Sequence, residues 1–255
     1  MKKILIALAA AAALAGCSEK DDGLSKFTVG FDADFPPYGY KDGAEYKGFD
    51  LDLARAVCER KGWKFVANPI NWDAKDMELN SGAIDCIWNG FTIQGREDAY
   101  TFSAPYVDNS QVVLVKADSA ISALADLSAK VVGVQIDTPV EKSLSKGGSH
   151  SQLGATFREL KVEPNYNQLT QELDAGAVDA VALDVGVARK KMSDLPGKFR
   201  ILDEIVMKET YGIGFKKGNT ALRDEVEAAL RQLAADGVID ALAEKYGIEK
   251  SAIRL

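Results

Sequence analysis

Residues 78–87 read ELNSGAIDCI, and residues 172–181 read ELDAGAVDAV. Five of the ten positions are identical, and two more exchange isoleucine for valine. Each copy reads as the end of a helix, a glycine that stops it, and an apolar strand with one acidic residue. Two copies are too few for a solenoid, so the repeat predicts two similar lobes.

Helices and strands alternate around both copies. Phe27–Gly30 reads as a strand, and Ala83–Trp88 as a buried one. Residues 49–60 carry apolar side chains at helical spacing before the stop at Gly62, and Asp73 can cap a helix that runs to Leu79. Such alternation predicts an α/β fold, with parallel sheets and helices on both faces.

Each repeated strand leads into a polar loop, at residues 88–92 in the first copy and 183–186 in the second. Ligands of open α/β sheets bind beyond the carboxyl ends of the strands. Two lobes that face each other through these ends would form a cleft lined from both sides.

The N-terminus predicts export. Two lysines precede the apolar run Ile4–Ala13, which is too short for a membrane span of roughly 20 residues. The run leads to Leu14-Ala15-Gly16-Cys17, which resembles the lipobox of bacterial lipoproteins. We therefore expect residues 1–16 to be a signal peptide, Cys17 to carry lipid and residues 17–25 to be a tether. The alternative is an ordinary cleaved signal with a chance cysteine.

Composition narrows the class of function. The 255 residues carry a formal net charge of −7 and no basic cluster, which disfavours nucleic-acid binding. The single histidine, His150, lies in a Gly/Ser-rich turn, so we expect neither a metal site nor a cofactor. Cys58 and Cys86 either form a disulfide outside the cytoplasm or are two buried thiols.

Three further stretches carry a family resemblance: FDADFPPY at 31–38, GFDLDLA at 48–54 and NGFTIQGRE at 89–97. With residues 132–135, 182–184, 211–215 and 233–237, they resemble the polar amino-acid-binding proteins of bacterial ABC importers. The resemblance covers nearly the whole mature chain.

That resemblance implies a two-lobed type II periplasmic-binding fold, in which each lobe is a mainly parallel sheet flanked by helices. Residues 26–112 would form the first lobe and 113–213 the second, and 214–255 would return to the first. Two crossovers would join the lobes, near residues 111–114 and 212–215.

The resemblance also implies roles in binding a free amino acid. Arg96 would grip the carboxylate with its planar fork, which lysine cannot do. Asp184 would face the ammonium, and Thr138, before the helix expected at 140–145, would help to hold the carboxylate. The other expected contacts are Asp32 near the ligand side chain, Phe35 and Trp72 as walls, Thr92 through its hydroxyl, and the backbone of Asn89 and Gly90.

Each of these residues also has an ordinary structural reading. Arg96 would then be a surface arginine, Asp184 and Thr138 would cap helices, and Phe35 and Trp72 would be core residues. The chain also departs from the family, which often has Gly-Thr-Thr or Gly-Thr-Ser where this sequence has residues 137–139, Asp-Thr-Pro. Position 139 thus lacks a hydroxyl and an N–H, and position 137 adds a negative charge.

The sequence as a whole favours an extracytoplasmic, lipid-anchored monomer that hands a polar L-amino acid to the permease and ATPase subunits of an ABC importer. Asp32 and Asp34 favour a cationic or amide side chain, and the aromatic residues suit a long one. The alternative is an exported dehydratase-like enzyme on the same scaffold. With a single histidine the chain offers no Ser/His/Asp set for such an enzyme, but an enzyme that uses carboxyl groups as acid and base remains an alternative.

Overall fold

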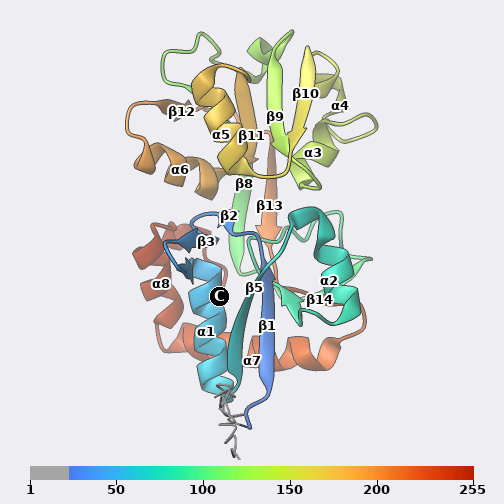
Figure 1. Cartoon of the computed structure of the whole chain (residues 1–255), viewed down its shortest axis with the longest axis vertical. Coiled ribbons are helices and arrows are strands. Elements are labelled where there is room, and N and C mark those ends of the chain that lie inside the picture. The colour runs from blue at the N-terminus through green and yellow to red at the C-terminus, as the bar shows by residue number, and fades with distance from the viewer. Residues whose placement is uncertain (1–22) are drawn as a thin grey trace, which may run out of the picture.

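The computed structural model describes residues 23–255, so the predicted signal peptide, Cys17 and most of the predicted tether lie outside the described residues. The chain forms two lobes, each with its own sheet, and two long strands run between them (Figure 1). This agrees with the two lobes that the repeat predicts.

The first lobe contains a mixed five-stranded sheet in the order β5-β1-β6-β14-β7. β1 is parallel to β5 and β6, whereas β14, which returns from the other lobe, is antiparallel to β6 and β7. The strands are β1 (Lys26–Phe31), β5 (Lys64–Pro69), β6 (Cys86–Ile87), β7 (Tyr100–Phe102) and β14 (Gly214–Lys216). The other elements of this lobe are a small sheet of β2 (Asp34–Phe35), β3 (Gly39–Asp42) and β4 (Glu45–Lys47), the helices α1 (Phe49–Lys61), α2 (Lys75–Ser81), α7 (Thr220–Ala235) and α8 (Val238–Tyr246), and the short η1 (Trp72–Ala74) and η3 (Lys250–Ala252).

The second lobe repeats this plan in the order β10-β9-β11-β8-β12, with β13 also paired to β8. β9 is parallel to β10 and β11, and β8 is antiparallel to its partners. The strands are β8 (Val107–Lys116), β9 (Val131–Gln135), β10 (Glu159–Glu163), β11 (Ala180–Asp184), β12 (Phe199–Ile201) and β13 (Met207–Tyr211). The helices are η2 (Leu124–Leu127), α3 (Pro139–Leu144), α4 (Ser151–Gly154), α5 (Tyr166–Ala175) and α6 (Val185–Asp194).

The repeated acidic residue has the same structural role in each lobe. Asp85 Oδ2 accepts a hydrogen bond from the backbone N–H of Thr28 at 2.6 Å, and Asp179 Oδ2 accepts one from Val131 at 2.8 Å. Each acid thereby ties its segment to β1 or β9, the neighbouring parallel strand of its own lobe. The repeat is therefore a structural unit that brings equivalent strand ends to the cleft.

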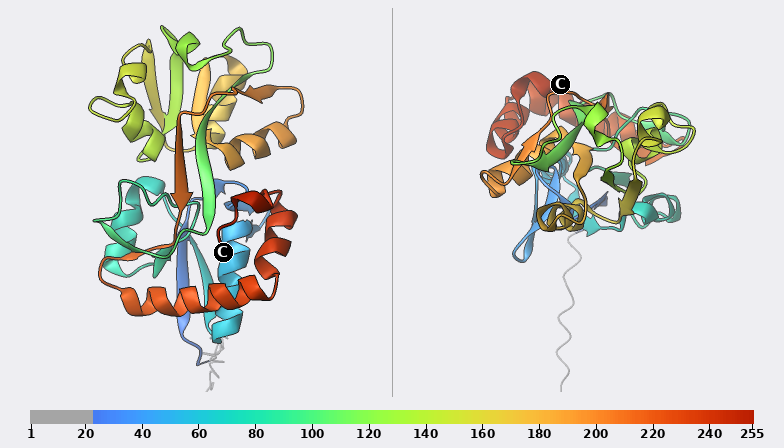
Figure 2. Two further views of the ribbon diagram at one scale, coloured as in Figure 1. Left: turned by 180° about the vertical axis from the view of Figure 1, so that it is seen from behind. Right: turned by 90° about the horizontal axis from the view of Figure 1, so that it is seen from above.

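The connecting strands are β8 and β13, which pair antiparallel from Val107↔Tyr211 to Gln111↔Met207 (Figure 2). This pairing begins a few residues before the crossovers that the sequence suggests. The difference arises because residues 111–114 of β8 already pair with β11 inside the second lobe.

Local boundaries also differ from the sequence prediction. α1 begins at Phe49 as expected and ends at Lys61, but the predicted cap at Asp73 is wrong, because Asp73 lies within η1 and α2 has no side-chain cap. Only Cys86 and Ile87 of the predicted strand at 83–88 enter the sheet.

The possible disulfide is not formed, because Cys58 on α1 and Cys86 on β6 are both free and buried. Burial raises the pKa of the Cys58 thiol to about 12 and also raises the pKa of Cys86. Both therefore stay protonated at neutral pH, which makes them poorly reactive core residues.

Candidate functional site

A small cavity lies between the lobes, at the carboxyl ends of the parallel strands. Its free space is about 20 Å³, far less than the roughly 300 Å³ at which small-molecule sites begin, so the lobes are packed closely around it. The structure brings all nine residues expected to bind the ligand to this one cavity: Asp32, Phe35, Trp72, Asn89, Gly90, Thr92, Arg96, Thr138 and Asp184. Gln135 and Pro139 complete its lining.

Arg96 is held in the loop after β6 and is 7% exposed. Its Nη2 donates to the carbonyl of Asp137 at 2.7 Å and its Nη1 to the carbonyl of Thr92 at 3.3 Å, while Cζ lies 4.8 Å from the centre of the Phe91 ring. Burial lowers the pKa of Arg96, but a guanidinium stays charged in proteins. These two bonds leave three of its five N–H donors for a ligand.

Asp184 ends β11 in the second lobe and is 4% exposed. Its Oδ1 accepts hydrogen bonds from Asn109 at 2.8 Å, from Gln111 at 3.0 Å and from the hydroxyl of Tyr211. Its Oδ2 has only a long contact of 3.5 Å with the hydroxyl of Tyr166. Asp184 occupies the N-cap position of α6 without a side-chain capping bond, so Oδ2 keeps capacity for a ligand.

The remaining predicted residues have mixed roles. Phe35 and Trp72 are 6% and 9% exposed, so they are both core residues and cavity walls. Thr138 caps α3, because its Oγ1 accepts from the N–H of Glu141 at 3.3 Å, and it donates to the carbonyl of Gln135 at 2.7 Å.

Gly90 shows why one position in the loop after β6 is a glycine. Its φ is +56°, and a Cβ there would lie 2.7 Å from Cε1 of Phe35. Its N–H donates to Oδ2 of Asp50 at 2.6 Å, so the backbone is fixed close to the cavity.

Asp32 joins the lobes, because Gln135 Nε2 donates to its Oδ2 at 2.6 Å. Burial raises the pKa of Asp32. Asp34 differs from the sequence interpretation: its Oδ1 accepts from Asn167 at 2.5 Å, and it does not line the cavity. The Asp34 carboxylate therefore forms a hydrogen bond that joins the two lobes.

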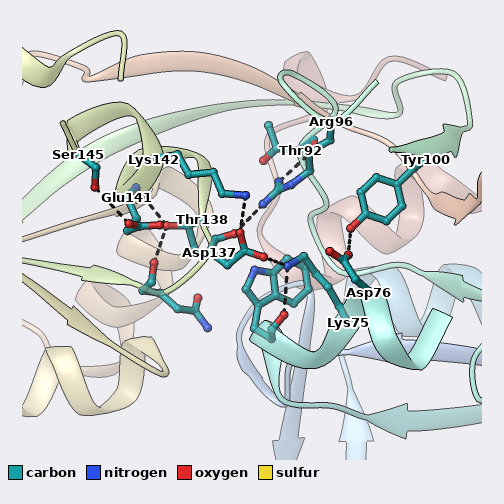
Figure 3. Close-up of polar contacts among 12 residues, drawn as sticks. Lys75, Asp76, Thr92, Arg96, Tyr100, Asp137, Thr138, Glu141, Lys142 and Ser145 are labelled. Atoms are coloured by element: carbon teal, nitrogen blue, oxygen red, sulfur yellow. Dashed lines mark hydrogen bonds and ion pairs between the residues drawn. The ribbon is translucent and has the colours of Figure 1, made fainter. Parts of the chain in front are cut away.

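Asp137 is the centre of a second inter-lobe cluster (Figure 3). Its carboxylate forms ion pairs with Lys75 of the first lobe and Lys142 of its own lobe. Its carbonyl accepts from Arg96, and its φ of 55° lies in the left-handed region. The carboxylate of Asp137, which departs from the family pattern, therefore links one lobe to the other. Burial alone would raise the pKa of Asp137, but its partners Lys142 and Lys75 lower it below the usual value.

Sequence reasoning assigned no role to Gln135 or Glu209. Glu209 on β13 is 3% exposed and accepts from Thr92 Oγ1 at 3.1 Å, from Asn109 at 2.5 Å and from Gln111 at 2.7 Å. Its only sequence signal is its position two residues before the motif at 211–215.

Comparison with known proteins identifies the family. The model of the bacterial extracellular solute-binding proteins, family 3, matches residues 27–249. The chain belongs to this family. The prokaryotic membrane lipoprotein lipid attachment site matches residues 1–18, so this solute-binding protein is an extracytoplasmic, membrane-anchored lipoprotein.

Similar proteins cover almost the whole chain. The arginine-binding extracellular protein ArtP of Bacillus subtilis (strain 168) is 30% identical over 96% of this chain and 98% of its own. An ABC uptake transporter substrate binding protein from Streptococcus pneumoniae, solved with bound histidine, has a TM-score of 0.83 and 28% identity, and covers 90% of this chain and 95% of its own. The ancestral amino acid-binding protein AncCDT-1, a precursor of cyclohexadienyl dehydratase, has a TM-score of 0.78 and 30% identity, with coverages of 87% and 95%.

The described residues contain neither a membrane-spanning helix nor a metal-ligating cluster, and His150 has a local role. None of the helices there is long and apolar enough to cross a membrane. Residues 23–255 contain no group of three or more His, Cys, Asp or Glu that could hold a metal ion. His150 Nδ1 hydrogen-bonds with Ser143 at 2.7 Å and Ser149 at 3.1 Å, and none of the three lines the cavity.

Proposed function

We propose that this solute-binding protein closes its two lobes around a free polar L-amino acid and delivers it to the permease and ATPase subunits of an ABC importer. The observation that carries the proposal is the pair of opposite charges, Arg96 and Asp184, which line one cavity from different lobes. A free amino acid presents the complementary charges, a carboxylate and an ammonium.

Arg96 binds the carboxylate in this proposal. Its guanidinium is already oriented by two carbonyls and an aromatic face, so little side-chain entropy is lost on binding. Asp184 binds the ammonium through Oδ2. A ligand that touches both lobes stabilises the closed form, and the permease then recognises closure.

The ligand side chain points toward Asp32, with Phe35 and Trp72 beside it. A cationic or amide side chain suits the carboxyl of Asp32 and the amide of Gln135. ArtP is named for arginine binding and the Streptococcus pneumoniae protein was solved with histidine, which fits this class.

The ligand is found by a thermal-shift screen of the mature lipoprotein in detergent against the twenty amino acids and cystine. A ligand raises the apparent free energy of unfolding by RT ln(1 + [L]/Kd). We expect one or a few polar amino acids to raise Tm, and a screen with no hit would contradict the proposal.

The clamp is tested with Arg96→Lys and Asp184→Ala by calorimetry. Removing one partner of a buried charge pair costs on the order of 2–5 kcal/mol, so Asp184→Ala should weaken binding about 30-fold or more. Arg96→Lys keeps the charge but loses the planar fork, so it should also bind poorly. Near-normal affinity in both folded variants would exclude the clamp.

The alternative is an enzyme that uses a carboxyl group as its general acid or base. Two observations favour it: the raised pKa of Asp32 and Asp184 in the cavity, and the likeness to a dehydratase precursor. The binding protein should return its ligand unchanged. Proton NMR of the ligand after long incubation with stoichiometric protein distinguishes the two, because an enzyme would yield a new product.

A further inference from the structure

Two carboxylates lie side by side where the connecting strands meet the cavity. Asp184 is 4% exposed and Glu209 is 3% exposed. The Nδ2 of Asn109 donates to Asp184 Oδ1 at 2.8 Å and to Glu209 Oε1 at 2.5 Å. The Nε2 of Gln111 donates to the same two oxygens at 3.0 and 2.7 Å. Two nitrogens shared by the same two oxygens hold the carboxyl groups together.

This pair has no ion-pair partner among residues 23–255. The nearby Arg96 attracts Glu209 through space, but it gives its hydrogen bonds to two carbonyls. The donors that do reach the pair are neutral amides and hydroxyls. Two buried like charges in contact are unfavourable, so the site requires either a proton or a cation.

Burial raises the pKa of Asp184, and the negative charge of Glu209 raises it further. Burial also raises the pKa of the surrounding tyrosines, so they remain neutral donors. The titratable and charged groups that surround the pair and its tyrosines are Tyr38 after β2, Tyr166 on α5, Tyr211 on β13, Arg96 after β6, Asp50 on α1, Asp32 after β1 and Arg189 on α6.

We propose that Asp184 and Glu209 form one cation site, in which Asp184 holds a proton without ligand and exchanges it for the ammonium of the amino acid. Asp184 lines the cavity and Glu209 does not. Oδ2 of Asp184 therefore contacts the ammonium, and the negative charge of Glu209 attracts the ammonium without touching it. The proton leaves to solvent, and the charge of the site is the same before and after the exchange.

This inference rests on the proposed function and adds Glu209 as a positioning residue for ammonium binding. Because each bound ammonium displaces one proton, affinity should tighten about tenfold per pH unit while Asp184 is protonated. Ligands that lack a free ammonium, such as the N-acetyl amino acid, should not displace the proton and should bind poorly.

The test counts protons by calorimetry. The mature lipoprotein in detergent is titrated at pH 6.5 with the best amino acid from the screen of twenty and cystine, in phosphate and in Bis-Tris. The difference in binding enthalpy between the buffers gives the number of protons released. We expect close to one for the wild type.

Glu209→Gln keeps the size of the side chain but removes its charge. It should release less than half as many protons at pH 6.5 and should show a flatter pH dependence of affinity, because Asp184 then loses its proton at lower pH. Glu45→Gln, whose side chain is 74% exposed on β4, is the control and should behave as the wild type.

Two results would overturn the inference while leaving the proposed function intact. One is tight binding by the wild type with almost no proton release. This result does not depend on whether any variant folds. The other is unchanged proton release in Glu209→Gln, which would place the proton on Asp184 without any help from Glu209, or on another group such as Asp32. If no amino acid binds, the proposed function and this inference fail together.

Discussion

Asp50 is a buried residue that holds part of the cavity lining in place. It lies on α1, is fully buried, and its Oδ2 accepts from the N–H of Gly90 at 2.6 Å and from the hydroxyl of Tyr106 at 2.8 Å. Its other oxygen, Oδ1, has no partner among the described residues. Burial raises the pKa of Asp50 from 3.8 to about 7.

This shift predicts a pH-dependent stability difference for Asp50→Asn. Between about pH 4 and pH 7 the unfolded chain has lost the Asp50 proton and the folded chain has kept it, so this group lowers the free energy of unfolding as pH rises. Asparagine removes that dependence. Relative to the wild type, the variant should therefore become more stable from pH 4 to pH 8, by up to about 4 kcal/mol.

Urea unfolding at both pH values measures the difference, with the exposed Asp73→Asn as a control. An unchanged difference between variant and wild type at the two pH values would refute the ionisation of Asp50 in this window.

Residues within distinctive motifs could be predicted from the sequence, as the cavity position of Arg96 illustrates. Glu209 could not, because its burial arises from the pairing of β13 with β8, whose paired residues are 96 to 104 positions apart in the chain. Asp34 was misassigned because its partner, Asn167, belongs to the other lobe, and the sequence does not reveal how the lobes meet.

At the scale of elements, α1 was predicted well because its apolar spacing and its stop at Gly62 are local signals. Its N-terminus depends on a longer-range contact. The N–H groups of Phe49 and Asp50 donate to the carbonyls of Pro37 and Tyr38 at 2.9 and 3.0 Å, in place of a side-chain cap. Two motifs that are separate in the sequence therefore dock backbone to backbone.

This docking predicts a large cost for Gly48→Ala. Gly48 has a φ of 139°, and a Cβ there would lie 2.0 Å from the carbonyl oxygen of Tyr38. Because that atom belongs to the backbone, the clash cannot be relieved by a rotamer change, and we expect a loss of more than about 3 kcal/mol in unfolding free energy.

Gly43→Ala is the matched control, since Gly43 also has a positive φ, of 62°, but nothing lies within 4 Å of the added Cβ. It should cost only about 1 kcal/mol from backbone strain. Equal losses in the two variants, measured by urea unfolding, would show that close docking of α1 is not what requires Gly48.

At the scale of the whole molecule, polar contacts outside the cavity help to join the lobes. Asp34 accepts from Asn167, which in turn accepts from Lys191 of α6. Lys75 of α2 forms an ion pair with Asp137. The Lys75 side chain is 1% exposed, and its Nζ also donates to the carbonyl of Trp72 at 3.2 Å. The contacts that cross between the lobes require the lobes to lie together, so we expect them to set how much of the ligand's binding energy is needed for closure.

Asp137 offers an internal control for this idea, because it pairs with Lys75 across the lobes and with Lys142 within one lobe. Lys75→Met should favour the open form and weaken amino-acid binding by about tenfold, or about 1.4 kcal/mol, since Asp137 keeps one partner and some solvent. Lys142→Met removes the same charge but no inter-lobe contact, so it should bind like the wild type. Calorimetry gives the affinities, and small-angle scattering of the ligand-free variants reports opening as a larger radius of gyration. Equal affinities and equal radii for the two variants would mean that the ion pair accompanies closure without stabilising it.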